Sequence, residues 1–267
     1  MEIVNSVILG IIQGATEFIP VSSSGHLILM RDLLNMEVEY SLAFDAVLQL
    51  ATTFAVLVYF RKDIFNLAKN FFKFISGKFV DAKELILLKA VILGTIPAVV
   101  IGLLIEDLME TIFRNSFLVA MSLIVGGFIM FFAEKFAKKI EQKKDLSVKR
   151  GIGIGFFQAL ALVPGFSRSG MTISGGLFLG LKREDATRFA FVLAFPVLLG
   201  AGLKKLLDLG STGLLDSVGI ELFAGSLASF LVGILAIHFL VTFLKKHTLN
   251  AFVIYRFALA IIVLLLV

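Results

Sequence analysis

Pro20-Val21-Ser22-Ser23-Ser24-Gly25 interrupts the first apolar segment of the chain, Ile3 to Ile19. A second apolar segment, Gly151 to Val163, ends in the same way, at Pro164 and the run Ser167-Arg168-Ser169-Gly170. Irregular backbone within a bilayer occurs only where protein or a water-filled cavity satisfies its amide groups. We therefore expect two re-entrant hairpins that meet at an internal site. Two ordinary proline-kinked helices are the alternative.

The composition of the whole chain indicates a membrane protein. Of its 267 residues, 58% are hydrophobic and 17% are charged, and the mean hydropathy is +0.99. Soluble domains average about 45–50% apolar and about 25% charged residues, so a water-soluble globule is excluded. No cysteine occurs, which excludes disulfides and thiolate chemistry. The net charge of +5 indicates membrane topology rather than nucleic-acid binding.

Six further stretches are long and apolar enough to cross a bilayer, the shorter ones with help from flanking residues, since a span needs about 20 residues. They are Ala43 to Phe60, Leu85 to Ile105, Phe117 to Ala133, Phe189 to Leu203, Leu222 to Leu240 and Ala251 to Val267. We expect no cleaved signal peptide, because Glu2 stands where a basic segment would precede the apolar run. The predicted fold class is all-α: a polytopic membrane protein that forms a single membrane domain over residues 1–267.

The basic segments predict how the chain is oriented. Arg61 to Lys89 and Glu134 to Arg150 each contain seven basic and three acidic residues, so both belong on the cytoplasmic side. Glu106 to Ser116, between the two spans that join them, is mainly acidic and falls outside. Lys204 and Lys205 also fall outside, against the rule. With this orientation the first hairpin opens outward and the second opens inward.

An internal repeat relates the two halves. Gly10-Ile11-Ile12-Gln13 and Ser22-Ser23-Ser24-Gly25 resemble Gly155-Phe156-Phe157-Gln158 and Ser167-Arg168-Ser169-Gly170 at a constant offset of 145 positions. We predict a first repeat over residues 1–133, a basic cytoplasmic loop over 134–150 and a second repeat over 151–267. Each repeat is a broken hairpin followed by three crossings. An odd number of crossings inverts the second copy, so the two hairpins converge near the membrane midplane.

Polar groups in the first hairpin predict an anion site with acid and base groups. A charge at the bilayer centre costs about 2.5–3.5 kcal/mol, so buried ionisable groups usually face partners, water or substrate. Gln13 and Glu17 share one helix face, and Ser23 and His26 share a face of the next helix. The start of that helix presents free N–H groups and the positive end of its dipole.

The second hairpin adds hydroxyls and a guanidinium, which binds phosphate oxygens in a bidentate fashion. Together the two hairpins predict a phosphate pocket. The candidate catalytic residues are Glu17, Ser23, His26 and Arg168. The candidate substrate-binding residues are Gln13, Ser22, Ser24, Gly25, Gly165, Ser167, Ser169, Gly170 and Thr172. A divalent cation, Mg²⁺ or Ca²⁺, could bridge Glu17 and a diphosphate, although no metal-binding motif is present.

Several of these residues have structural alternatives. The serines at 22–24 could merely cap a helix, Arg168 could pair with Glu17 or Asp45, and His26 could be a core histidine. We expect Asp45 and Gln49 to brace the hairpin without touching substrate. The stretch from Arg61 to Lys89 is basic and rich in Phe, so we interpret it as a helix that lies on anionic headgroups. We interpret His238 and His247 as interfacial residues. Arg256 is interpreted as a residue that pairs within the helix bundle, and its role is unassigned.

Two long motifs resemble one known family. Gln13-Gly14-Ala15-Thr16-Glu17-Phe18-Ile19-Pro20-Val21-Ser22-Ser23-Ser24-Gly25-His26 and Pro164-Gly165-Phe166-Ser167-Arg168-Ser169-Gly170-Met171-Thr172 are similar to the signatures of the undecaprenyl-diphosphate phosphatase family, the bacitracin-resistance type. The resemblance implies an enzyme that hydrolyses a polyprenyl diphosphate to the monophosphate and phosphate, with a divalent cation. It implies a multi-pass protein of the cell membrane that recycles the lipid carrier of envelope polysaccharide (peptidoglycan) synthesis. It leaves open a homodimer.

The hypothesised mechanism assigns a role to each matched residue. Arg168 and the helix ends hold the diphosphate, Ser23 attacks the terminal phosphorus, and Glu17 or His26 takes the proton. Attack by His26 or by water stays open. Many relatives have Glu-Phe-Ser-Phe where this chain has Arg188-Phe189-Ala190-Phe191, so that serine is missing. A transporter or flippase of an anionic phosphate lipid is the alternative function, because broken inverted repeats are typical of carriers.

Overall fold

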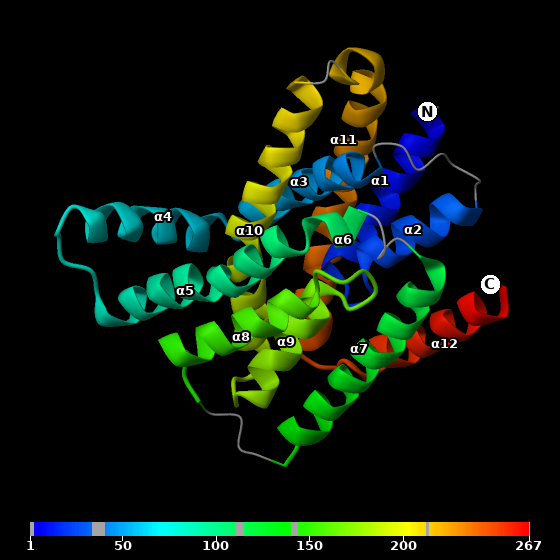
Figure 1. Ribbon diagram of the computed structural model, residues 1–267. Coiled ribbons are helices and arrows are strands. Elements are labelled where there is room, and N and C mark those ends of the chain that lie inside the picture. Colours follow the sequence, from blue (N-terminus) through cyan, green and yellow to red (C-terminus); the bar gives the residue numbers. More distant parts are fainter. Residues whose placement is uncertain (1–2, 34–40, 111–114, 140–143, 212–213, 267) are drawn as a thin grey trace.

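The computed structural model describes residues 3–33, 41–110, 115–139, 144–211 and 214–266, and every regular element in these ranges is a helix (Figure 1). The twelve helices are α1 (Ile3–Phe18), α2 (Ser23–Leu33), α3 (Ser41–Tyr59), α4 (Arg61–Ile75), α5 (Ala82–Leu104), α6 (Glu106–Glu110), α7 (Ser116–Ala137), α8 (Val148–Leu160), α9 (Arg168–Phe178), α10 (Arg183–Ser211), α11 (Leu214–Leu244) and α12 (Asn250–Leu266). The predicted all-α class is confirmed.

Four helices, α5, α7, α10 and α11, are long and apolar enough to cross a membrane by themselves. The other two predicted spans correspond to α3, which meets α4 at an angle of 91°, and to α12, which is shorter. The chain is therefore an integral multi-pass membrane protein. Val267, the last residue of the sixth predicted span, lies outside the described residues.

Both predicted breaks separate two short helices. In the first, α1 ends at Phe18 and α2 begins at Ser23, and in the second, α8 ends at Leu160 and α9 begins at Arg168. Ser22 and Ser167 both adopt the left-handed backbone conformation, with φ of +76° and +70°. Left-handed φ is uncommon outside glycine, so its occurrence at two serines 145 positions apart is a specific feature that the hairpins share.

The first helix of each hairpin packs against a helix from the opposite half of the chain. The most extensive helix contact of α1 is with α11, and that of α8 is with α5. At each contact a glycine is required: a Cβ on Gly10 would lie 2.1 Å from the Gly225 carbonyl oxygen, and a Cβ on Gly155 would lie 2.1 Å from that of Gly94. The two repeats stay a prediction, which these matched close approaches support.

The first half carries an extra helix, α4. The glycines of the hairpins, Gly10 and Gly155, are 145 positions apart, whereas the glycines that they contact, Gly94 and Gly225, are only 131 positions apart. The first half therefore contains 14 more residues between hairpin and partner helix, which is close to the 15 residues of α4. Its exposed apolar side chains include Phe65, Phe72 and Ile75. The predicted headgroup helix over Arg61 to Lys89 is too long, because the residues from Ala82 onward begin α5. Asp81 caps α5 there, its carboxylate accepting a hydrogen bond from the Lys83 N–H.

Candidate active site

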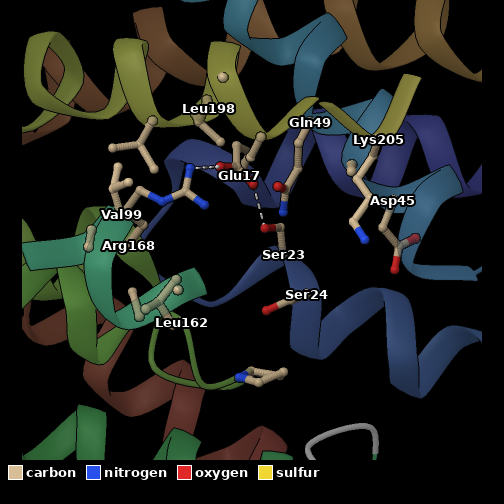
Figure 2. Close-up of a pocket in the computed structure, with 18 of the residues that line it drawn as sticks. Glu17, Ser23, Ser24, Asp45, Gln49, Val99, Leu162, Arg168, Leu198 and Lys205 are labelled. Carbon is tan, nitrogen blue, oxygen red and sulfur yellow. Dashed lines mark hydrogen bonds and ion pairs between the residues drawn. The ribbon is translucent and has the colours of Figure 1, made fainter. Parts of the chain in front are cut away.

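Glu17 is the centre of the polar site. It is buried in the last turn of α1, where its Oε2 accepts a hydrogen bond of 2.8 Å from Gln13 Nε2, one turn earlier on the same helix face. The same oxygen accepts a hydrogen bond of 2.5 Å from Ser23 Oγ (Figure 2). A carboxylate at this distance can take the serine proton, so the geometry suits an activated nucleophile.

Arg168 completes this cluster from the second hairpin. It is the first residue of α9, and its NH1 donates a 3.3 Å hydrogen bond to Glu17 Oε1, as Figure 2 shows. The Glu17 side chain is only 4% exposed, whereas that of Arg168 is 19% exposed. The guanidinium therefore neutralises the buried carboxylate and still reaches open space, where it could contact a phosphate. The predicted meeting of the two hairpins is observed at this ion pair.

The serine turns are tied together beneath the cluster. Ser22 Oγ accepts hydrogen bonds from the Gly25 N–H at 3.3 Å and from the Gly165 N–H at 2.9 Å, which joins the first turn to the second. In the second turn, Ser167 Oγ likewise accepts a hydrogen bond of 3.3 Å from the Gly170 N–H. Ser22 therefore caps a helix, as the structural alternative for the serines proposed, whereas Ser23 contacts Glu17.

Thr172 and Ser169 face inward rather than toward an opening. Thr172 Oγ1 donates to the Arg168 carbonyl oxygen at 2.8 Å, and Ser169 Oγ lies 3.2 Å from Ser167 Oγ. Both side chains are buried. Thr172, Ser169 and Gly170 thus support the start of α9, while the N–H groups of Gly25 and Gly165 bond to Ser22. None of these five predicted binding residues lines the cavity described next.

A cavity of about 380 Å³ lies above the cluster. Its polar lining comprises Glu17, Ser22, Ser23, Ser24, Asp45, Gln49, Glu106, Ser167, Arg168, Lys204 and Lys205. Apolar residues such as Val99, Leu162 and Leu198 line the rest of the wall (Figure 2). A phosphate group can therefore lie on the polar floor while a hydrocarbon chain contacts the apolar wall.

His26 is directed away from this cavity. Its Nδ1 lies 2.7 Å from the Ser22 carbonyl oxygen and its Nε2 lies 2.8 Å from the Tyr255 hydroxyl, and the two rings are stacked. His26 is not among the residues that line the cavity. Ser23 begins α2 and His26 lies one turn further along, so sharing a helix face does not bring both to Glu17. The geometry favours the core-histidine alternative.

Arg256 is a site residue whose role the sequence did not reveal. Its fully buried guanidinium donates five hydrogen bonds to backbone carbonyl oxygens. These acceptors belong to Pro20 in the first turn, Gly165 and Phe166 in the second turn, and Ser122 and Leu123 in α7. An arginine within an apolar span was the available signal, but only the fold identifies its acceptors.

Asp45 braces the first hairpin, as predicted, through Arg31. Asp45 and Gln49 both line the cavity, however, and their lack of contact with substrate stays a prediction. Arg31 of α2 donates two hydrogen bonds to the Asp45 carboxylate of α3, at 2.9 and 2.5 Å, and both side chains are buried. Buried charges are tolerated when paired in this way. Arg31 was detectable as the single Lys or Arg in the sequence from Ile3 to Leu33.

The donor set limits how a metal ion could bind. Among the described residues, no group of three or more His, Asp and Glu side chains could hold one. Glu17 already contacts Ser23 and Arg168, while the Asp45 carboxylate is held by Arg31. One carboxylate fits an ion that is ligated mainly by substrate phosphate oxygens, and it does not fit a cage made entirely of protein ligands.

The fold and the site together define a class: a membrane protein with a phosphate-binding, acid–base site between two broken hairpins. A family model described as Bacitracin resistance protein BacA matches residues 6–262, and the chain belongs to that family. The undecaprenyl-diphosphatase of Elusimicrobium minutum is 43% identical over 99% of this chain and 98% of that protein. Those of Rubrobacter xylanophilus and Methanosphaera stadtmanae are 40% and 38% identical, each over at least 97% of both chains.

Proposed function

We propose that this protein is an undecaprenyl-diphosphatase, which hydrolyses the lipid diphosphate to undecaprenyl phosphate and inorganic phosphate. The observation that carries the proposal is the contact of Glu17 with both Ser23 and Arg168 at the floor of the cavity. A nucleophile, its base and a cation for the phosphate are thereby within one cluster. Relatives that match over their full length bear the same enzyme name.

In the proposed first step, Ser23 Oγ attacks the terminal phosphorus and Glu17 accepts the hydroxyl proton. The bond between that phosphorus and the bridging oxygen breaks, and undecaprenyl phosphate leaves with the bridging oxygen. Arg168 compensates the charge on the phosphoryl oxygens, where electrostatic stabilisation contributes most. Glu17 passes its proton to the departing undecaprenyl phosphate and is again a free carboxylate. In the second step, water attacks the phosphoserine, Glu17 takes a proton from the water and returns it to Ser23 Oγ as the Oγ–phosphorus bond breaks, and phosphate is released.

The open alternatives for the nucleophile differ in how well they fit this geometry. His26 is held between the Ser22 carbonyl oxygen and Tyr255, so attack by His26 would require both contacts to break. Direct attack by water would use the same Glu17 base and would leave Ser23 as a hydrogen-bond donor. The 2.5 Å contact between Ser23 and Glu17 supports attack by serine.

A divalent cation, Mg²⁺ or Ca²⁺, is part of the proposal. The groups that would hold it are the Glu17 carboxylate and the diphosphate oxygens of the substrate. When bound, such an ion supplies charge neutralisation on the phosphate oxygens. The protein's own contribution is to hold the Glu17 carboxylate beside Ser23 and Arg168.

We further propose that the protein acts in the cell membrane and returns the lipid carrier to envelope polysaccharide synthesis. The cavity reaches Glu106 at the end of α5, in the segment whose charge predicts the outer side of the membrane. This arrangement supports hydrolysis of diphosphate headgroups at the outer surface. The prenyl tail would stay among the apolar helices while the headgroup is inside the cavity.

The test is phosphate release from undecaprenyl diphosphate by purified protein in detergent, compared with Ser23→Ala and Ser211→Ala. Wild type should release phosphate, Ser23→Ala should lose about 10³-fold or more in activity, and Ser211→Ala should keep the wild-type activity. Ser211 is a suitable control because it is an exposed serine at the end of α10 that does not line the cavity. No release by wild type, with lipid translocation in vesicles, would establish the carrier instead.

A further inference from the structure

Two adjacent lysines lie at the end of the cavity that is remote from the catalytic cluster. Lys204 and Lys205, on α10, line the cavity together with Glu106, which follows α5. Figure 2 shows Lys205 near Asp45 on one side of the cavity and Arg168 on the other. The charge pattern predicts this end to be outside, where lysines are not favoured by topology. The pair therefore needs another explanation.

The two ammonium groups share one carboxylate. Lys204 Nζ lies 2.8 and 2.6 Å from the two oxygens of Glu106, and Lys205 Nζ lies 2.8 Å from Glu106 Oε1. Hydrogen bonds from Lys204 and then Lys205 hold the pKa of Glu106 below its ordinary value. Glu106 is therefore ionised at neutral pH, and its carboxylate faces two ammonium groups.

Partial exposure leaves these groups able to exchange partners. The side chains of Lys204, Lys205 and Glu106 are 49%, 18% and 25% exposed, respectively. Lys204 is half exposed, so water screens its ion pair with Glu106 and that pair contributes little stability. A ligand with two or more anionic oxygens can therefore replace the Glu106 carboxylate at low cost.

We propose that Lys204 and Lys205 form a docking site for the diphosphate headgroup at the mouth of the cavity, with Glu106 as the counter-ion that the headgroup displaces. The inference rests on the proposed function, because it takes the same lipid diphosphate as its ligand. The headgroup contacts the lysines first and then moves along the cavity to Arg168 and Ser23. Inorganic phosphate, the product, meets the same lysines as it leaves.

The test is steady-state kinetics of the full-length protein with undecaprenyl diphosphate in detergent at low and high salt. In Lys204→Ala/Lys205→Ala we expect KM to rise about tenfold, kcat to stay within about twofold, and the salt dependence of KM to weaken. The matched control is Lys245→Ala/Lys246→Ala, which removes an equally charged, exposed pair at the other end of the bundle. This control should leave KM unchanged.

Glu106→Gln separates docking from a structural ion pair. It removes the counter-ion but keeps both lysines, so KM should fall about two- to threefold. A structural role predicts lower stability and no fall in KM. The proposal is overturned if the lysine variant keeps the wild-type KM, or if Glu106→Gln raises KM as the lysine variant does. If the double alanine variant fails to fold, two other variants still test the proposal. Glu106→Gln should lower KM as above, and Lys204→Arg/Lys205→Arg, which retains both charges, should keep the wild-type KM.

Inhibition by inorganic phosphate distinguishes the two sources of anion. If the lysines bind product as well as substrate, the phosphate inhibition constant should rise in the lysine variant in parallel with KM. A rise in KM without a change in phosphate inhibition would overturn the exit role and restrict the site to the lipid headgroup. Turnover by wild type tests the proposed function separately, because that measurement does not depend on Lys204 or Lys205.

Discussion

In the first hairpin the helix after the turn begins with Ser23, whereas in the second hairpin it begins with Arg168, the residue 145 positions later. The same offset leads from Glu17 to Leu162, an apolar residue of the cavity wall. The turns nevertheless share left-handed serines at 22 and 167. Similar backbones thus supply Ser23 and Glu17 from one copy and Arg168 from the other.

This difference teaches why a site between two related hairpins need not be symmetric. Two facing carboxylates would repel each other, and two facing arginines would do the same. With Glu17 opposite Arg168, each buried charge has a partner of opposite sign, 3.3 Å away. The backbone supplies position, while the side chains at matched places supply complementary chemistry. The predictions below test this division of labour, beginning with the largest expected effect.

Glu17→Gln should cause the largest loss. The amide keeps the size of the side chain but cannot accept the Ser23 proton, and general base catalysis contributes about 10²–10⁴-fold. We expect turnover of undecaprenyl diphosphate to fall about 10³-fold, measured as phosphate release. Exchange of the two matched positions, Glu17→Leu with Leu162→Glu, should stay inactive, because Ser23 is then beside leucine. Recovery of activity in the exchanged chain would contradict the division of labour.

Arg256→Met should destabilise the region that both turns share. The variant keeps an apolar stem but removes the guanidinium donors from the turn carbonyl oxygens of Pro20, Gly165 and Phe166. Each unsatisfied buried group costs about 1–3 kcal/mol, so we expect a loss of about 3 kcal/mol or more. The measurement is the melting temperature in detergent micelles, together with turnover.

The control for this change is Arg61→Met, which removes an exposed arginine near the start of α4. Surface changes of this kind usually lie within about 0.5 kcal/mol, so the melting temperature should stay near that of wild type. Equal melting temperatures for Arg256→Met and wild type would show that the two turns hold their positions without the guanidinium. The hydrogen bond from the Gly165 N–H to Ser22 Oγ would then be sufficient to join them.

Arg168→Lys should have a smaller effect than the loss of the base. Lysine keeps the charge but lacks the planar fork that binds phosphate oxygens in pairs. We expect kcat/KM to fall about 10²-fold, in the range for loss of one electrostatic contact to a developing charge. The effect should fall on kcat more than on KM, since the contact is strongest in the transition state. An unchanged kcat would mean that Arg168 only binds substrate or only balances Glu17.

The sequence predicted much of this arrangement because its signals are local. Apolar length gave the spans, and proline and serine after half-length segments gave the two breaks. Polar residues at a constant offset, namely the matched glutamines at 13 and 158 and the matched serines, related the first motif to the second. The spacing of Gln13 and Glu17 correctly placed both on one helix face, where they form a hydrogen bond, since residues four apart are neighbours on a helix.

What the sequence could not supply depends on contacts between distant helices. His26 and Ser23 share a helix face, but only the packing of α12 shows that His26 bonds to Tyr255. Arg256 lies far along the chain from the turns that it joins. Lys204 and Lys205 contradict the positive-inside rule, and only the structure shows that both contact Glu106. These partners are separated by long stretches of sequence, so no periodicity relates them.

Gly10→Ala and Gly155→Ala test the comparison at the level of packing. In both, a new Cβ would lie 2.1 Å from a backbone carbonyl oxygen, so the two helices must move apart. Overpacking of this kind costs about 1–3 kcal/mol, and equivalent contacts should give similar losses in melting temperature. Gly219→Ala on α11 is the control: its Cβ would meet nothing within 4 Å, so the variant should be as stable as wild type. A lower melting temperature for Gly10→Ala but not for Gly155→Ala would mean that α8 can move to accommodate the new methyl group and that α1 cannot. The hairpins would then share a backbone shape without sharing rigidity, and the Glu17 side of the site would be the fixed one.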